Sequence, residues 1–212
     1  MGKSGSCADR SKHNSGNALR PPNGRRAIAE GPLGVMRLTL DHNVIIDLAK
    51  DAPNTICLRE VLAEQKHQGF VVEIGASEMR QRGIRPDRFD LFEELLDEAG
   101  IRALPRLTPM MIWDVTFWDH GLWSDDAMMN RATEIEQVLF GESPQIDIAS
   151  TPQDSPQFAA WLNRVCDVQT MWCHLHYENE VFVTSDRNFH KATKAPRLLA
   201  MGAGRIAKPE EL

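Results

Sequence analysis

A short apolar run that ends on a carboxylate, within residues 37–47, most constrains the fold of this chain. Residues 37–40 carry two leucines and are followed directly by Asp41. Asp41 or Asn43 suits the N-cap of a helix, since either side chain can accept a hydrogen bond from a first-turn N–H. The stretch therefore predicts a buried strand, a turn and a helix whose apolar side consists of Val44, Ile45, Ile46 and Leu48.

Further strands and helices alternate along the chain. We expect strands at residues 70–74, 101–104, 181–186 and 205–207, and helices at residues 55–68, 77–80, 88–99, 126–140 and 158–177. Such alternation favours a parallel sheet with helices on both faces. The prediction is an α/β protein, a three-layer α/β/α sandwich with a central parallel sheet of four or five strands.

Two segments depart from this alternation. Residues 1–35 are rich in Ser, Gly, Asn, Pro and Arg and carry a net charge of +4, which predicts a disordered basic tail before a domain at residues 36–212. Residues 105–156 are interpreted as an insertion in that domain, in which residues 111–118 form a strand or begin a helix. Its aromatic side chains either make a partner or dimer surface or fill a local core: Trp113, Phe117, Trp118 and Trp123.

Composition and charge exclude several classes of protein. An apolar fraction of 42% and a charged fraction of 25% are typical of a soluble globular protein. No apolar run approaches the roughly 20 residues of a membrane span. Four cysteines without CxxC spacing, and the lack of a secretory signal, predict reduced thiols and a cytoplasmic location. A net charge of −6 argues against a surface that coats nucleic acid, but a nuclease with a carboxylate site stays open.

Carboxylates end two of the predicted strands. Asp41 follows the first strand and Asp186 ends the strand at residues 181–186, so both are expected at the carboxyl edge of a parallel sheet, where ligands bind. Gathered carboxylates repel one another, which raises the pKa of at least one of them in the absence of a cation. Hard carboxylate oxygens are the ligands of Mg²⁺ and Mn²⁺.

The segments around these acids resemble the PIN domain family of metal-dependent ribonucleases, including its toxins of toxin–antitoxin pairs. The matching segments are residues 40–46, residues 76–80, the helix that carries Asp167, and residues 182–189. The nineteen-residue step from Asp167 to Asp186 is similar to the spacing of the last two acids in the family. The end of the chain, residues 204–211, also looks like the end of the family's domain.

The resemblance implies an acidic metal site that binds Mg²⁺ or Mn²⁺ and hydrolyses RNA. Its catalytic and metal-binding residues would be Asp41, Glu78, Asp167 and Asp186. Asn43 and Thr184 match polar residues that position the acids, and Asn188 lies where some members have a further acid. His42 stands where a small hydroxyl residue is commoner. Within the sequence, Glu73 competes with Glu78 for its role, although a residue inside a strand more often faces a neighbour.

Basic residues flank both halves of the predicted site. Arg80 and Arg82 follow Glu78, while Arg187 and Lys191 follow Asp186, so all four are candidates for binding the RNA backbone. The alternative is that such residues form surface ion pairs. His174 lies two helical turns after Asp167 on the same predicted face, where it either borders the substrate groove or packs in the core.

Three classes of function stay open on the sequence. The first is a metal-dependent endoribonuclease, for which the resemblance also implies a protein antitoxin or a homodimer partner and no membrane. The second is a PIN-like scaffold that binds RNA or a protein without cleavage. The third is a small-molecule phosphohydrolase that uses the same acids, although the chain lacks the DxDx[TV] motif of haloacid dehalogenases.

Overall fold

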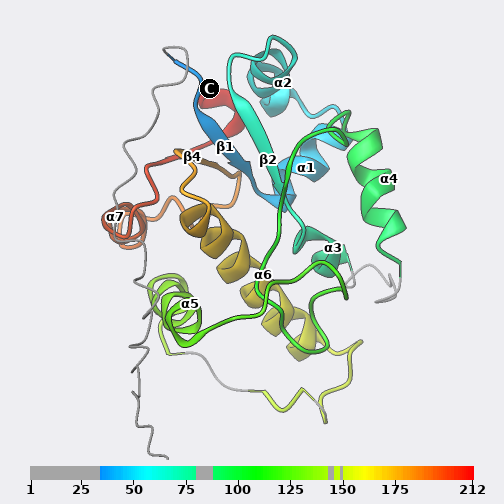
Figure 1. Cartoon of the computed structure of the whole chain (residues 1–212), viewed down its shortest axis with the longest axis vertical. Helices are drawn as coiled ribbons and strands as arrows, with labels where there is room; N and C mark the ends of the chain where they lie inside the picture. The colour runs from blue at the N-terminus through cyan, green and yellow to red at the C-terminus, as the bar shows by residue number, and fades with distance from the viewer. Residues whose placement is uncertain (1–33, 80–87, 143–145, 149) are drawn as a thin grey trace, which may run out of the picture. The chain divides into compact units, whose positions relative to one another are not determined.

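The computed structural model describes residues 34–79, 88–142, 146–148 and 150–212. The core of this part is a five-stranded sheet in the order β3-β2-β1-β4-β5, in which every neighbouring pair is parallel (Figure 1). The predicted α/β class, with a parallel sheet of four or five strands, is therefore confirmed. The strands are β1 (Arg37–Leu40), β2 (Gln68–Val72), β3 (Arg106–Leu107), β4 (Val181–Val183) and β5 (Arg205–Ala207).

Helices cover both faces of the sheet and define two hydrophobic cores. One core contains side chains of α1 (His42–Ala49), α2 (Ile56–Ala63) and α4 (Asp90–Glu98). The other contains side chains of α5 (Asp126–Leu139), α6 (Pro156–His176) and α7 (Ala195–Ala200). The strands alternate between the two cores, as a period of two requires: Val181 and Val183 belong to the first core and Phe182 to the second.

Shorter helical segments connect the main elements, and an N-cap marks the start of the long helix α6. A single turn, α3 (Gly75–Glu78), follows β2, and the described residues include the 3-10 helices η1 (Pro53–Thr55) and η3 (Pro209–Glu211). Helix α6 begins with Pro156 after Ser155, whose hydroxyl accepts a hydrogen bond from the N–H of Phe158 at 3.1 Å. This N-cap fixes the start of the helix that carries Asp167.

The strand predicted at residues 181–186 ends at Val183, and two other predicted elements differ more from the structure. The third strand is β3 rather than residues 101–104, because Gly100 ends α4 in a left-handed conformation (φ 72°) and Ile101 folds back to bond the carbonyl of Leu96. The helix predicted at residues 55–68 ends at Ala63, because Gln65 is left-handed (φ 52°) and β2 already begins at Gln68.

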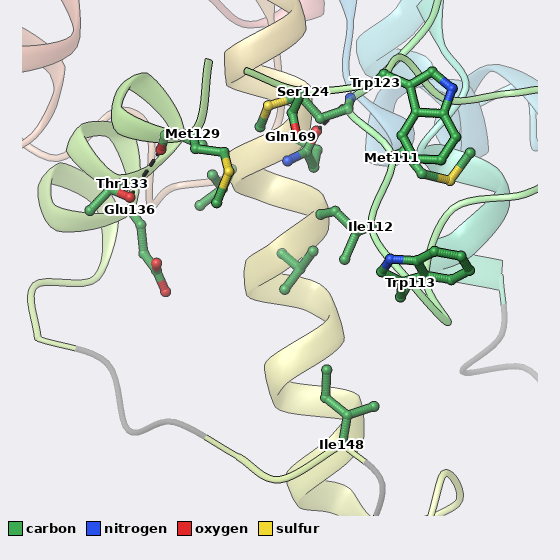
Figure 2. Close-up of a pocket in the computed structure, with 14 residues that line it drawn as sticks. Met111, Ile112, Trp113, Trp123, Ser124, Met129, Thr133, Glu136, Ile148 and Gln169 are labelled. Carbon is green, nitrogen blue, oxygen red and sulfur yellow. Dashed lines mark hydrogen bonds between the residues drawn. The ribbon is translucent and has the colours of Figure 1, made fainter. Parts of the chain in front are cut away.

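Residues 111–118 form neither a strand nor the start of a helix. They make turns beside an isolated bridge between Met110 and Leu122, and residues 111–113 line a cavity of about 540 Å³ (Figure 2). Of the four aromatic residues predicted here, Phe117 is buried, while three tryptophans are exposed. Phe117 therefore fills a local core, while the three tryptophans leave apolar surface exposed.

Two predictions fall largely or wholly outside the described residues. The disordered tail predicted at residues 1–35 lies there except for residues 34 and 35, and Arg80 and Arg82 lie there entirely. Within the described ranges, no helix combines the length and the apolarity needed to cross a membrane.

Candidate functional site

The candidate site lies at the carboxyl ends of the adjacent strands β1 and β4. Asp41 directly follows β1 and caps α1, with its Oδ1 accepting a hydrogen bond from the N–H of His42 at 2.8 Å. The backbone N–H of Asp41 donates to the carbonyl of Val183, the last residue of β4, at 3.0 Å. The parallel pairing of the two strands thus brings Asp41 beside Thr184, which lies 143 positions further along the chain.

The second carboxylate oxygen of Asp41 is held by two polar side chains. The Thr184 hydroxyl donates to Oδ2 at 2.6 Å, and the Asn43 amide donates to the same atom at 2.8 Å. The carbonyl of the Asn43 side chain accepts the N–H of Ser185 at 3.2 Å. Asn43 and Thr184, predicted as supporting residues, therefore fix the carboxylate of Asp41 and tie the ends of the two strands together.

Burial and neighbouring charge both disfavour the ionised form of Asp41. Its pKa is raised from 3.8 to about 6, mainly by burial and further by the charge of Asp186. The hydrogen bonds from Thr184, His42 and Asn43 act in the opposite direction, because they stabilise the carboxylate. A carboxylate with this pKa at the edge of a sheet is a candidate functional group.

The pKa of Asp167 depends on the charges of the other three predicted acids. Burial raises its pKa well above the usual range, and the charges of Asp41, Glu78 and Asp186 raise it further. Asp41, Glu78 and Asp167 also line a common cavity of about 200 Å³. The side chains of His42, Asn43, Ile46 and Asn163 complete its lining. The structure therefore places three of the four predicted acids around one cavity, and Asp186 lies outside its lining but still influences the pKa of Asp167.

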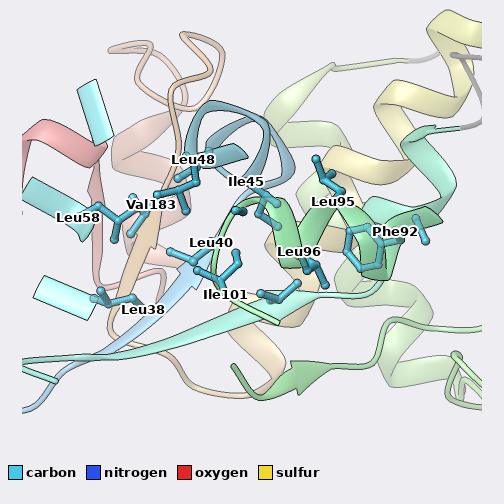
Figure 3. Packing of buried hydrophobic residues seen from close by; sticks show 14 of the residues in the cluster. Leu38, Leu40, Ile45, Leu48, Leu58, Phe92, Leu95, Leu96, Ile101 and Val183 are labelled. Atoms are coloured by element: carbon cyan, nitrogen blue, oxygen red, sulfur yellow. The ribbon is translucent and has the colours of Figure 1, made fainter. Parts of the chain in front are cut away.

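Glu78 reaches this site from the last residue of the short helix α3. Its Oε2 lies 3.9 Å from Nε2 of His42. The packing needs a glycine at position 75, because a Cβ there would lie 2.7 Å from Nδ1 of His42 and 3.0 Å from the ring of Phe92. Phe92 belongs to the hydrophobic core that also fixes helix α1 through Ile45 and Leu48 (Figure 3). The core below the site therefore sets the position of His42.

Asp186 is held by the loop that follows β4. Its backbone N–H donates to the Thr184 hydroxyl oxygen at 3.0 Å, and its Oδ1 accepts the N–H of Asn188 at 2.8 Å. The side-chain oxygen of Asn188 in turn accepts from Lys191 at 3.3 Å and also from Lys194. Asn188, predicted as a supporting residue, thus shapes the loop through its backbone and gathers the lysines beside the acids.

Lys194 influences the acids but was not among the predicted site residues, and neither was Asn163, which lines the cavity. The positive charge of Lys194 lowers the pKa of Asp167, and its own pKa is lowered by burial and by Lys191 but raised by Asp186 and Asp167. It also donates to the carbonyl of Leu139 at the end of α5. In the sequence Lys194 is one of several basic residues after Asp186, and only the packing of α5 against α7 singles it out. The predicted Arg187 and Lys191 are both exposed.

Of the two alternatives for His174, the structure confirms packing in the core and contradicts a place at the border of a substrate groove. The side chain is fully buried in the core, with Nδ1 2.9 Å from the Thr39 hydroxyl and Nε2 2.9 Å from the carbonyl of Ala203. Burial lowers its pKa from 6.5 to about 4, so the ring is neutral at pH 7. Glu73 likewise faces neighbours, since it accepts from Thr108 and pairs with His120, both at 3.0 Å.

The side chains of the site fit a hard divalent cation in chemistry and charge. A hard divalent cation would offset the negative charge that raises the pKa values of Asp41 and Asp167, and Asp41, Glu78, Asp167 and Asp186 are the residues that would hold it. Their spacing is looser than a finished site, because the described residues contain no group of three His, Cys, Asp or Glu side chains close enough to hold a metal ion. The structure therefore defines an α/β protein with an acidic cavity at the sheet edge.

Comparisons of the chain with protein-family models, with curated proteins and with solved structures find no match.

Proposed function

We propose that this protein is a PIN-like, metal-dependent ribonuclease that hydrolyses RNA phosphodiester bonds at the acidic cavity. The observation that carries the proposal is the single cavity that Asp41, Glu78 and Asp167 line together. Burial and the charges of Asp41, Glu78 and Asp186 raise the pKa of Asp167. Such crowding of carboxylates is costly for folding and is typical of sites that bind divalent cations. The proposed toxin role and its antitoxin partner rest on the family resemblance alone.

The chemistry of the site supports this assignment. A bound Mg²⁺ or Mn²⁺ supplies a water of lowered pKa and stabilises the charge that develops on the phosphate. The residues of the chain orient the acids: Thr184 and Asn43 fix Asp41, and the loop after β4 fixes Asp186. Lys194 adds a positive charge beside the acids, where it favours the approach of a polyanion.

The experiment that tests the proposal is RNA cleavage by the parent protein and by Asp186→Asn with Mn²⁺ present. We expect cleavage to fall by about two orders of magnitude or more, because Asn keeps the shape of the side chain but loses the charge that a hard cation requires. Stabilisation by Mn²⁺, measured as a shift of the melting temperature, should disappear in the same variant. Glu73→Gln is the matched control, since Glu73 lies in the same segment as Glu78 but faces Thr108 and His120.

Two outcomes would contradict the ribonuclease proposal. One is an Asp186→Asn variant that cleaves RNA at the parent rate with its Mn²⁺-dependent melting shift intact. The other is hydrolysis of p-nitrophenyl phosphate without cleavage of structured RNA, which would favour the small-molecule phosphohydrolase.

A non-cleaving PIN-like scaffold is the second candidate. The observation that favours it is the spacing of the acids, of which no three lie close enough to hold an ion within the described part of the chain. Calorimetric titration with Mn²⁺ separates the two candidates. The scaffold predicts no binding that depends on Asp41 and Asp186, whereas the nuclease predicts binding that either Asn substitution abolishes.

A further inference from the structure

A second, larger cavity lies on the other side of helix α6. Its volume is about 540 Å³, and Figure 2 shows Met129, Thr133 and Glu136 of α5 on one side and Met111, Ile112 and Trp113 of the preceding loop on the other. Trp123 lies above, and Val165, Val168 and Gln169 of α6 contribute to the lining. We name this feature the Trp groove, defined by Met110–Trp113, Trp123, Ser124, Ile148 and the lining residues of α5 and α6.

The Trp groove is separate from the acidic cavity. Asn163 and Asp167 line the acidic cavity, whereas Val165, Val168 and Gln169 line the Trp groove. At 100° per residue, these two sets of positions lie on opposite faces of one helix. A ligand in the Trp groove therefore need not contact the proposed nuclease site, and binding in the groove is independent of the proposed function.

The groove exposes large aromatic side chains that the fold does not bury. Trp113 is 66% exposed and Trp123 is 78% exposed, and Met129 on the facing helix is 57% exposed. Trp172 shows that the same chain can bury a tryptophan, since only 1% of it is exposed. Contiguous apolar surface of this kind, arranged around a groove, is typical of a site that binds a protein or peptide.

The charge around the groove identifies the kind of partner that fits. Residues 107–160, which supply the loop wall and α5, contain nine acidic residues and only Arg131 as a base, a net charge of −8. The other 158 residues together carry +2. Asp114, Asp125 and Asp147 are next in sequence to the lining residues Trp113, Ser124 and Ile148. Glu136 lines the groove itself and is paired with Arg164 at 3.5 Å. This distribution disfavours a nucleic acid and favours a positively charged ligand.

We propose that the Trp groove binds an amphipathic, positively charged peptide segment of a partner protein. Apolar side chains of that segment lie between α5 and the tryptophan loop, as in the recognition of an amphipathic helix by a hydrophobic groove. Its Lys or Arg side chains lie against the acidic residues of the rim. Trp113 and Trp123 are the anchoring residues, because each offers a large apolar face in the groove.

The test uses the full-length protein and two synthetic peptides of about 14 residues, roughly four helical turns. The first has leucine at positions i, i+3, i+4 and i+7 and their repeats, with lysine elsewhere, and the second replaces every lysine by glutamate. Calorimetry should show binding of the lysine peptide only, weakened about tenfold when the salt concentration is raised about tenfold. Absence of binding at about 100 µM lysine peptide, or equal binding of both peptides, would overturn the proposal.

Variants locate the peptide on the protein. The double substitution Trp113→Ala/Trp123→Ala should weaken binding of the lysine peptide at least about tenfold, because both anchors are lost. Ile56→Ala is the matched control, since Ile56 is 57% exposed but lies on α2, outside the groove. If the double variant fails to fold, Asp114→Asn with Asp125→Asn should weaken binding through charge, because Asn can replace Asp125 as the N-cap of α5. Parent affinity in a folded double variant, or in the charge variant, refutes the site.

A deletion variant distinguishes binding of a partner protein in the groove from occupation of the groove by the chain's own N-terminal segment. Residues 1–33 are basic, so they compete with the peptide if they occupy the groove. The partner assignment predicts that deleting them leaves the affinity for the lysine peptide unchanged. An affinity about tenfold higher after the deletion would assign the groove to the chain's own N-terminal segment and overturn binding of a partner.

Discussion

The ionisation of Asp41 gives a quantitative prediction for the cation-free protein. Its pKa is about 6 in the folded state and near 3.8 when exposed to solvent. One pKa unit corresponds to about 1.36 kcal/mol, so holding Asp41 ionised in the fold costs about 3 kcal/mol above pH 6. Because the folded pKa is the higher one, the folded state binds the proton first, and stability rises as the pH falls from about 6 to about 4.

The substitution Asp41→Asn removes this titration. Asn cannot ionise, but it also cannot accept all the hydrogen bonds that reach the carboxylate from His42, Asn43 and Thr184. That loss costs about 1–3 kcal/mol at every pH. The variant should therefore be less stable than the parent near pH 4 and equal to it or more stable near pH 8, a relative change of about 3 kcal/mol.

The difference between parent and variant is the quantity to measure, because His174 titrates in the opposite direction. Its folded pKa of about 4 lies below its ordinary value of 6.5, so its contribution to stability is lost as the pH falls from 6.5 to 4. The two effects offset each other in the parent protein. Urea denaturation in EDTA at a series of pH values gives both stability curves, and their difference isolates Asp41 with the carboxylates coupled to it.

Glu94→Gln is the control, because it removes one negative charge from an exposed position on α4. Its stability should follow the parent at every pH. If the difference between the parent and Asp41→Asn changes by less than about 1 kcal/mol between pH 4 and pH 8, burial does not control this carboxylate and the reasoning fails.

Three further predictions concern contacts of the site and the core. Thr184→Val should lower the free energy of unfolding by about 1–3 kcal/mol at pH 8, because Asp41 loses its 2.6 Å hydrogen bond; urea denaturation showing no loss would contradict this. Between pH 6.5 and pH 4, His174→Leu should lose about 3 kcal/mol less stability than the parent. An equal loss in both proteins would argue against a buried neutral ring. Gly75→Ala should cost about 1–3 kcal/mol by thermal denaturation, because the new methyl group overlaps His42, and parent stability would disprove the tight packing.

Sequence periodicity located the elements whose signals were local. Strand β5 begins and ends where it was predicted, and α5 differs from its prediction by one residue. The third strand was misplaced because apolar character alone cannot separate a strand from a buried turn. Ile101 is only 6% exposed, yet it belongs to the turn that ends α4. The two-residue strand β3 is set by its pairing with Val71 and Val72, which the sequence does not display.

In the candidate site, too, the sequence predicts what local signals determine and not what tertiary packing determines. Asp41 and Asp186 follow apolar strands, so their place at the sheet edge could be predicted from the chain. Lys194 and Asn163 could not, since nothing local marks which basic or amide side chain turns toward the acids. The direction of a side chain on α6 or near α7 depends on tertiary packing, which also buried His174 rather than exposing it.

The pairing of β1 with β4 also has a consequence for the order of events during synthesis. Asp41 leaves the ribosome early, but its partner Thr184 follows 143 residues later. At 5–20 residues per second, the acid waits roughly 7–30 s before the hydroxyl that holds it exists. During that time β2 is available to pair with one edge of β1, but the partner of its other edge, β4, does not yet exist. A nascent chain therefore carries Asp41 without an assembled site until β4 and Thr184 have been made.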